Sequence, residues 1–375
     1  MVRNDRNNIP ACLLLMVALL VAGSARAELG RETPDEYWSL SELFENQPEQ
    51  RDLTDRFSDR VADAAVPIEA PSDPVRIAIV YPAIQASDYW RRSIVALEAR
   101  LDELGISYEI TSQFTQPGQE IQEQTRQVAE ALKSDPDYLV FTLDALRHRV
   151  IVERLIARKR PKVILQNITT PLRRWGSEQP FLYVGFDHAS GTRLLAEHIL
   201  HTRPQAEPYA IFYGPKGLVS QARGEPFRLA MVERSRKRLV ASYYVGFDRE
   251  RAREAAMTLL ARQPDVGFIF SCSTDIALGV SDAIAEMGLV GDVSTNGWGG
   301  GSAELELIEN GHLSATVMRM NDDNGVAIAE AISLDLQGRG NDVPLVYSGA
   351  FELVPADHDR ARIEALKRRA FRYSR

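Results

Sequence analysis

Short apolar segments alternate regularly with amphipathic helical segments over residues 74–355. Buried-strand patterns such as "VRIAIVYP", "DYLVFTLD" and "VGFIFSCS" are each followed by a stretch with apolar side chains at helical spacing. After the first strand, for example, Ile94, Leu97 and Leu101 fall on one helical stripe. Such alternation is typical of parallel sheets with helices on both faces. Because roughly ten such strands are many for one sheet, we predict an α/β fold with two doubly wound, Rossmann-like lobes.

The same pattern gives approximate boundaries. We expect a hinge between the lobes and a helix over 225–238. The predicted segments are a leader (1–27), an N-terminal extension (28–73), an N-terminal lobe (74–186 plus 298–319), a C-terminal lobe (187–297 plus 320–355) and a C-terminal helix (356–375). The helix over 225–238 would begin just after Arg223, in "SQARGEP".

The first 27 residues have the pattern of a secretory signal. Arg3 and Arg6 precede the apolar stretch "IPACLLLMVALLVAG", and the small residues of "SARA" predict cleavage after Ala27. A retained membrane anchor is the alternative, but no basic stop-transfer flank follows the stretch. We therefore expect an exported, periplasmic protein whose mature chain keeps one cysteine, Cys272, and so has no internal disulfide.

The net charge is −8 for the whole chain. Such an acidic balance is unfavourable for binding nucleic acid or inserting at an anionic membrane surface. In the extension, Tyr37, Trp38, Leu40 and Leu43 recur at near-helical spacing. We expect this apolar stripe to cover the protein's own core, with a partner-docking surface as the alternative.

Enzyme signatures are absent from the sequence. The first strand leads into "YPAIQASDYW", which lacks the glycines of a dinucleotide-binding turn, and neither a phosphate-binding loop nor a nucleophile elbow occurs. His198 and His201 form a weak metal pattern without further ligands, so we predict no metal site and no cofactor. Cys272 follows the apolar "FIF" and is expected to be a buried, inert thiol. We predict a binding protein rather than an enzyme.

The ends of the predicted strands carry amide, hydroxyl and indole groups. Ligands of doubly wound sheets bind beyond the carboxyl ends of the strands, which makes these positions the candidate site. Amides and hydroxyls suit a ligand rich in hydroxyl groups, and indole faces cover the apolar side of a ring. Each residue alone is equally compatible with a helix cap, a turn or the core. The strand-end residues are Gln85, Ser87, Trp90, Asn167, Thr274, Asp275, Trp298 and Arg319.

Arg319 poses a specific question because it lies within the apolar strand end "ATVMRM". A buried guanidinium is costly unless it meets a partner. The near candidates within the chain are Asp322 and Asp323, but acidic residues at a helix start are already favoured by the helix dipole. The alternative is that the partner of Arg319 is an anionic ligand.

Several longer motifs carry a family resemblance. "ASDYW", "ILQNITTP", "FLYVGFDH", "CSTDIALG", "NGWGGGSAEL", "VMRMNDD" and "RIEALKRRAFRYS" resemble the LuxP-type periplasmic autoinducer-2 receptors of the type I periplasmic binding protein superfamily. The resemblance runs from the extension to the carboxyl terminus. It implies two lobes joined by three crossing strands that close on ligand, in a fold shared with the ribose- and galactose-binding proteins.

The resemblance also implies a ligand and a partner. Its pocket residues would be Gln85, Ser87, Trp90, Asn167, Arg223, Thr274, Trp298 and Arg319. Arg223 and Arg319 would face the borate ester of the furanosyl borate diester form of autoinducer-2. The sequence departs from the family around Gln85 and in "GPKGLVSQARGE". The implied partner is the periplasmic domain of a membrane sensor histidine kinase; a sugar-binding protein of an uptake system is the alternative, and a periplasmic enzyme is a weaker one.

Overall fold

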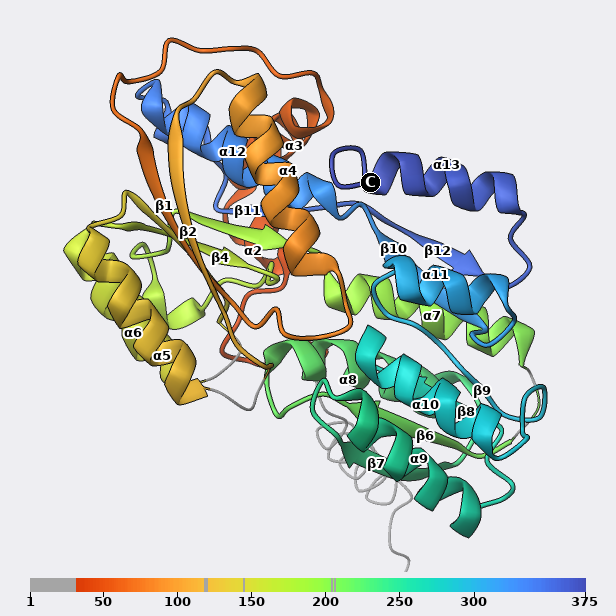
Figure 1. The fold of residues 1–375 in the computed structure, drawn as a ribbon. Helices are drawn as coiled ribbons and strands as arrows, with labels where there is room; N and C mark the ends of the chain where they lie inside the picture. The colour runs from red at the N-terminus through yellow and green to blue at the C-terminus, as the bar shows by residue number, and fades with distance from the viewer. Residues whose placement is uncertain (1–31, 118–120, 144–145, 204, 206) are drawn as a thin grey trace, which may run out of the picture.

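The computed structural model describes residues 32–375 apart from 118–120, 144–145, 204 and 206. The predicted signal peptide, including its cleavage point, lies outside these residues. Within the described part of the chain, no helix combines the length and apolarity needed to cross a membrane. Two parallel sheets, each flanked by helices, form the centres of two lobes (Figure 1), as the alternating pattern predicts.

The first lobe is built on a six-stranded parallel sheet in the order β11-β5-β4-β3-β1-β2. Its strands are β1 (Val75–Tyr81), β2 (Tyr108–Phe114), β3 (Tyr138–Phe141), β4 (Lys162–Gln166), β5 (Leu182–Gly185) and β11 (Val346–Ser348). Its helices are α4 (Tyr89–Glu103), α5 (Ile121–Ala131), α6 (Leu146–Arg158) and α12 (Asp322–Leu336). Alternate residues of β1 enter different cores: Ile77 and Ile79 join the core under α4 and α12, whereas Ala78 and Val80 join the core under α5 and α6. Both faces of the sheet are therefore covered, which explains the continuous apolar runs.

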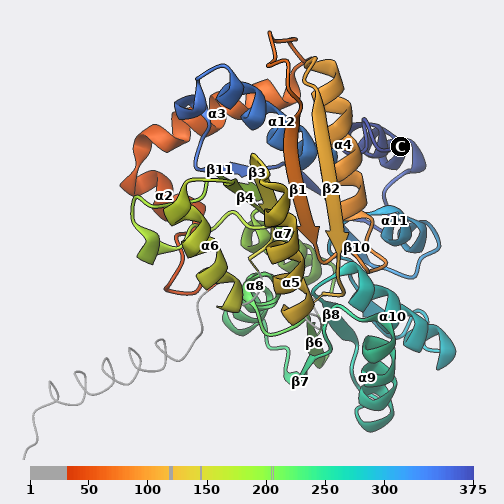
Figure 2. The ribbon, with the colours of Figure 1, turned by 60° about the vertical axis from the view of Figure 1, so that its left-hand side comes forward.

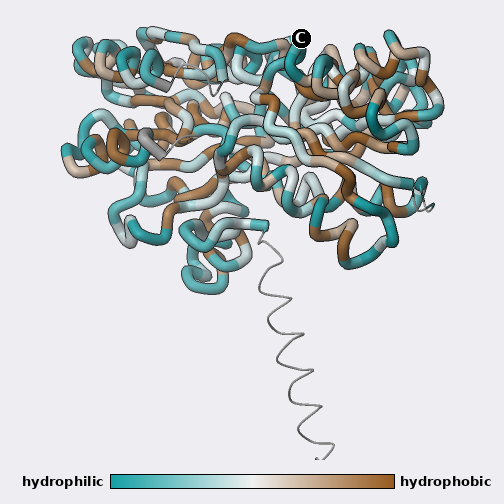
Figure 3. The backbone as a smooth tube through the Cα atoms, turned by 90° about the horizontal axis from the view of Figure 1, so that it is seen from below, coloured by the Kyte–Doolittle hydropathy of each residue, from teal (hydrophilic) through white to brown (hydrophobic). Residues whose placement is uncertain are grey.

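The second lobe is built on a parallel sheet in the order β7-β6-β8-β9. Its strands are β6 (Tyr209–Tyr213), β7 (Leu239–Tyr244), β8 (Phe268–Ser271) and β9 (Ser294–Thr295), with helices α7 (His188–Thr202), α8 (Leu218–Arg234), α9 (Arg249–Arg262) and α10 (Thr274–Glu286). An antiparallel pair, β10 (Ala315–Arg319) with β12 (Phe351–Pro355), packs beside this sheet with α11 (Ser302–Glu309) and α13 (Arg360–Ala370). In both lobes, apolar strands run through the interior and polar residues are frequent on the outer turns (Figure 3).

The chain passes between the lobes three times, after β5, after β10 and between β11 and β12. Two backbone hydrogen bonds join these crossings to one another: Gly349 donates its N–H to Gly185 O at 2.8 Å, and Met320 donates to Ala350 O at 2.9 Å. The predicted three-strand connection is present.

The predicted lobe boundaries are wrong for two elements of the C-terminal lobe and for one segment of the N-terminal lobe. Helix α12 packs against α4, and β11 pairs in parallel with β5, so both belong to the first lobe. Conversely, α11 and β10 pack with the second lobe. Helical and strand periodicity identify each element but do not encode which sheet edge it completes. The four elements α11, β10, α12 and β11 were therefore assigned to the wrong lobe.

The extension packs on the first lobe, as expected for an apolar stripe that covers the protein's own core. It forms α2 (Leu40–Asn46), which begins with a capping box between Ser39 and Glu42, and α3 (Pro48–Ala62). Phe57 of α3 joins the core under α12, and Leu43 of α2 joins the core on the opposite face. Figure 2 shows both helices following the outside of the lobe.

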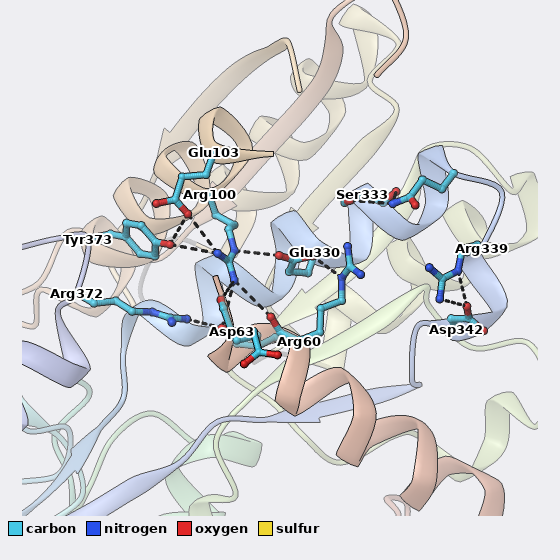
Figure 4. Close-up of polar contacts among 12 residues, drawn as sticks. Arg60, Asp63, Arg100, Glu103, Glu330, Ser333, Arg339, Asp342, Arg372 and Tyr373 are labelled. Carbon is cyan, nitrogen blue, oxygen red and sulfur yellow. Dashed lines mark hydrogen bonds and ion pairs between the residues drawn. The ribbon is translucent and has the colours of Figure 1, made fainter. Parts of the chain in front are cut away.

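A buried ion-pair cluster ties the extension and the C-terminal tail to the first lobe (Figure 4). Arg100 of α4 is fully buried, pairs with Glu330 of α12 at 2.9 Å and donates a hydrogen bond to Asp63 O at 2.6 Å. Arg60 of α3 pairs with the same carboxylate, and Tyr373 of the tail approaches Arg100 at 3.4 Å. Each buried charge here has an opposite charge beside it, which is the usual condition for burying one.

Candidate functional site

A cavity with about 490 Å³ of space between atoms lies between the lobes, at the carboxyl ends of the strands. All eight pocket residues implied by the family resemblance line it: Gln85, Ser87, Trp90, Asn167, Arg223, Thr274, Trp298 and Arg319. The first four come from the first lobe and the last four from the second. Asp275, the other strand-end residue named from the sequence, does not line the cavity. Parallel sheets bring the ends of distant strands to one edge, which is why residues so far apart in sequence meet.

Arg223 reaches the cavity from a helix rather than from the loop expected before residue 225. Helix α8 begins at Leu218, so Arg223 lies in its second turn, and Pro226 lies inside the helix. Proline is common at the first helical position, which is why the sequence suggested a later start. Arg223 is therefore helical, and its side chain lines the cavity.

Arg319, at the end of β10, is 4 % exposed. Its guanidinium carbon lies 4.2 Å from the ring centre of Tyr89 and 5.9 Å from that of Trp298. Its Nε donates a long hydrogen bond of 3.4 Å to Gly299 O. Among the described residues, no carboxylate forms an ion pair with Arg319, and burial lowers the pKa of its guanidinium.

Arg223 is also buried, with 5 % exposure, and stacks 3.9 Å above the Trp298 ring centre. Its Nη1 donates to Cys272 O at 3.1 Å, and its Nε donates to His188 Nδ1 at 3.3 Å. Burial, and then the charge of Arg319, lower the pKa of Arg223 to about 9. Two guanidinium groups therefore face one cavity, and no aspartate or glutamate lines it within the described part of the chain.

The two carboxylates nearest Arg319 in sequence have other partners. Asp322 accepts hydrogen bonds from the backbone N–H groups of Tyr373 and Ser374 at 2.7 and 2.9 Å. Asp323 pairs with Arg372 at 3.0 Å. Both therefore hold the C-terminal tail, and neither neutralises Arg319.

The first lobe supplies uncharged polar groups. Asn167 Oδ1 is buried and has no hydrogen-bond partner among the described residues, which leaves it available to a ligand hydroxyl. Gln85 donates its amide to Pro82 O. Trp90 packs on Tyr81 and Tyr89, with ring centres 4.6 and 4.7 Å apart, and presents an apolar wall to the cavity.

The lobes touch each other beside the cavity. Asp275 of α10 accepts hydrogen bonds across the gap from Ala86 N at 2.7 Å and Ser87 N at 3.3 Å. Asp88 of the first lobe accepts a hydrogen bond from Ser302 N at 3.3 Å. These contacts belong to a closed arrangement in which both lobes surround the cavity.

Some residues of the site were not predicted from the sequence. Tyr89, Thr142, Phe247 and Ser273 also line the cavity; Tyr89 could have been found because it lies between two predicted residues, whereas Phe247 carries no signal. Glu304 is fully buried and accepts hydrogen bonds from Trp298 N at 3.0 Å and Gly300 N at 2.7 Å. It shapes the glycine-rich loop before α11 without lining the cavity.

The described lining residues of this cavity include no cysteine, histidine or carboxylate. Cys272 is fully buried, and burial raises the pKa of its thiol, which makes it a poor nucleophile. Within the described residues, no group of three or more histidine, cysteine or acidic side chains could hold a metal ion.

The family model described as "Periplasmic binding protein domain" matches residues 77–340. The D-allose-binding periplasmic protein of Escherichia coli is 31 % identical over 143 residues, covering 37 % of this chain and 46 % of that protein. A ribose import binding protein of Salmonella typhimurium is 26 % identical over 157 residues, covering 42 % of this chain and 52 % of that protein. The chain thus spans about half the length of the curated relatives that it matches.

Solved structures with the same fold include two carbohydrate complexes. A periplasmic solute binding protein from Actinobacillus succinogenes with bound D-allose has a TM-score of 0.67 at 18 % identity, covering 78 % of this chain and 100 % of that chain. A solute binding protein from Agrobacterium radiobacter in complex with D-arabinose has a TM-score of 0.69 at 18 % identity, covering 79 % and 99 %. At this identity the likeness establishes the two-lobe α/β fold.

Proposed function

Because the chain belongs to the periplasmic binding protein domain family, whose members bind ligands and are not enzymes, we propose that it is a periplasmic receptor for one small, hydroxyl-rich anion. The observation that carries this proposal is the pair of buried arginines, Arg223 and Arg319, at a cavity without a carboxylate among its described lining residues. Two buried cationic groups without a carboxylate partner favour an anionic ligand.

The ligand that fits both this charge and the family resemblance is autoinducer-2 as its furanosyl borate diester. The tetrahedral borate ester carries the negative charge, and the planar guanidinium groups can donate paired hydrogen bonds to its oxygens. Ser87, Asn167 and Thr274 would serve the remaining hydroxyls.

We further propose that ligand occupancy is relayed to the periplasmic domain of a sensor histidine kinase, as the LuxP-type resemblance implies. Closure of the lobes on the ligand would present a changed surface to that partner. The proposal includes export to the periplasm with removal of residues 1–27. Co-purification of the mature chain with its cognate sensor domain, with and without ligand, tests the association directly.

A second function is the binding of a neutral sugar for uptake, and the D-allose- and ribose-binding relatives favour it. A neutral sugar would leave the charges of Arg223 and Arg319 without compensation when the lobes close. The two functions therefore differ in the expected charge of the ligand.

The deciding experiment is a calorimetric titration of synthetic autoinducer-2 in boron-depleted and in borate-supplemented buffer, with D-ribose and D-allose as competitors. The anion receptor binds the signal at least ~10-fold more tightly with borate, because a charged hydrogen-bonded contact contributes about 1.5–3 kcal/mol. Arg319→Lys should lose most of this preference, since an ammonium group lacks the fork of donors. Equal signal affinity in both buffers, together with tight binding of either sugar, would leave the uptake function as the better account.

A further inference from the structure

His188 lies outside the cavity lining yet contacts ligand-facing residues from both lobes. It is the first residue of α7, directly after the chain has crossed from β5 into the second lobe. Its side chain is 5 % exposed and packs edge-to-face on Trp298, with ring centres 5.1 Å apart. A polar ring at such a position is expected to have specific hydrogen-bond partners.

Its first partner is the backbone of Asn167 in the first lobe. His188 Nε2 lies 2.9 Å from Asn167 O, and because a carbonyl can only accept, the ring donates from Nε2. Asn167 has a φ of 71°, a left-handed conformation that carries strain unless the surroundings hold it. The bond from His188, together with the bond from Asn167 N to Val184 O at 2.8 Å, holds it and so aims Asn167 Oδ1 at the cavity.

Its second partner is Arg223 in the second lobe. With the proton on Nε2, His188 Nδ1 has a free lone pair and accepts from Arg223 Nε at 3.3 Å. One turn further along α7, Thr192 donates its hydroxyl to Arg223 O at 3.0 Å and accepts from Trp298 Nε1 at 2.9 Å. The same face of α7 therefore fixes the guanidinium of Arg223, its backbone and the indole on which it stacks.

We propose that His188 is a positioning residue that sets Arg223 and Asn167 in register with each other across the hinge, as a neutral imidazole with one donor and one acceptor. This role rests on the proposed function, since it concerns how the site presents Arg223 to an anion. It assigns the anion preference partly to a side chain that does not touch the ligand. Burial and the neighbouring charges of Arg223 and Arg319 hold the pKa of His188 well below its ordinary value, which agrees with a neutral ring.

Three substitutions separate the two hydrogen bonds. His188→Asn places an amide near the position of Nδ1 and can keep the acceptor for Arg223, whereas His188→Gln reaches toward the position of Nε2 and can keep the donor for Asn167. His188→Phe keeps the ring and removes both bonds. His148→Phe is the matched control, because His148 is an equally buried histidine that packs on Phe141 in the first lobe and does not line the cavity.

The measured quantity is the ratio of signal affinities with and without borate, using synthetic autoinducer-2 as the probe. We expect His188→Phe to reduce this ratio by ~10-fold or more, and His188→Asn to keep it within ~3-fold of the wild type, because a hydrogen bond to a charged group contributes about 1.5–3 kcal/mol. His188→Gln should lower the affinity mainly in the borate buffer and so reduce the ratio as His188→Phe does. His188→Asn, which loses the bond to Asn167 O, should instead lower the affinity in both buffers. His148→Phe should leave both affinities unchanged.

The outcomes distinguish this inference from the proposed function. A wild-type ratio near one overturns the proposed function itself, whereas a high wild-type ratio that persists in His188→Phe overturns only the role of His188. Nitrogen NMR of the wild-type protein gives a check that does not depend on a variant's folding. The Nε2–H tautomer is expected for His188 with and without the signal, and a ring protonated on Nδ1 would refute the proposal.

Discussion

Arg319→Met should stabilise the ligand-free protein, whereas Arg100→Met should destabilise it. Both arginines are almost fully buried, but their surroundings differ. Arg100 has the carboxylate of Glu330 at 2.9 Å, whereas Arg319 has, among the described residues, one long hydrogen bond to Gly299 O and the faces of aromatic rings. Methionine is a long, flexible side chain without charge. Comparing the two variants therefore shows which of the two guanidinium groups stabilises the folded protein.

The electrostatic effects on the two arginines at the cavity determine how large the stability change of Arg319→Met should be. Burial and the charge of Arg319 lower the pKa of Arg223 from 12.5 to about 9, which corresponds to about 5 kcal/mol disfavouring its charged form. Arg319→Met removes the repulsive part of this effect and also the cost of burying the Arg319 charge. The lost stacking on Tyr89 offsets about 1–2 kcal/mol. We therefore expect the free energy of unfolding to rise by about 2 kcal/mol, while Arg100→Met loses about 3–5 kcal/mol because Glu330 loses a buried partner.

Urea denaturation of the ligand-free proteins at pH 7, followed by far-ultraviolet circular dichroism, measures both changes. Thermal melting with and without the signal and borate then measures the ligand's contribution, which should be large for the wild type and nearly absent for Arg319→Met. If ligand-free Arg319→Met is less stable than the wild type by more than about 1 kcal/mol, the guanidinium is a structural element and the reasoning fails.

Three further changes test other parts of the structure. Asp275→Asn leaves one of the N–H groups of Ala86 and Ser87 without its carboxylate oxygen. Ligand affinity measured by calorimetry should fall ~10-fold, and X-ray scattering should show incomplete closure of the lobes. Unchanged affinity would mean that this contact does not hold the lobes together. Deleting residues 372–375 removes the hydrogen-bond donors to buried Asp322. The free energy of unfolding, measured by urea denaturation, should fall by about 3 kcal/mol, whereas Arg375→Ala should leave it almost unchanged. Burial lowers the pKa of His148 from 6.5 to about 4. As the pH falls through this range the unfolded chain binds a proton that the folded chain does not, so the free energy of unfolding should drop by up to about 3 kcal/mol. His148→Leu should flatten the pH dependence of the free energy of unfolding between pH 6.5 and 4, and an unchanged slope in this variant would contradict the prediction.

The sequence was sufficient for the architecture and for the grouping of the candidate residues because both follow from local patterns. Alternating strands and helices imply parallel sheets, and parallel sheets bring their carboxyl ends to one edge. Gln85, Asn167 and Thr274 could therefore be grouped although they lie on different strands and lobes. Whether they bind a ligand is a separate question, which the titrations address.

What the sequence could not supply depends on contacts between distant segments. The side of the hinge on which α12 packs is decided by its contact with α4, which leaves no trace in its own periodicity. His188 lies in the motif "FLYVGFDH", which does not indicate its role, and only the approach of α8 and of the loop at Asn167 reveals its two partners. Such residues carry an ordinary local signal and a specific tertiary role.

The glycine-rich stretch "GWGGGSAEL" shows how a local interpretation and a tertiary one combine. Gly299 and Gly300 have positive φ values of 155° and 64°, which glycine adopts readily in a tight turn. The surroundings add a second reason for glycine: a Cβ on Gly299 would lie 2.9 Å from Arg319 Nη2 and 3.0 Å from Thr274 Oγ1. The loop therefore gives up a side chain at the place where the guanidinium of Arg319 needs room beside the cavity. The positive φ of Gly299 and the close approach of Arg319 are thus two separate reasons for glycine at this position, one set by the turn and one by the tertiary structure.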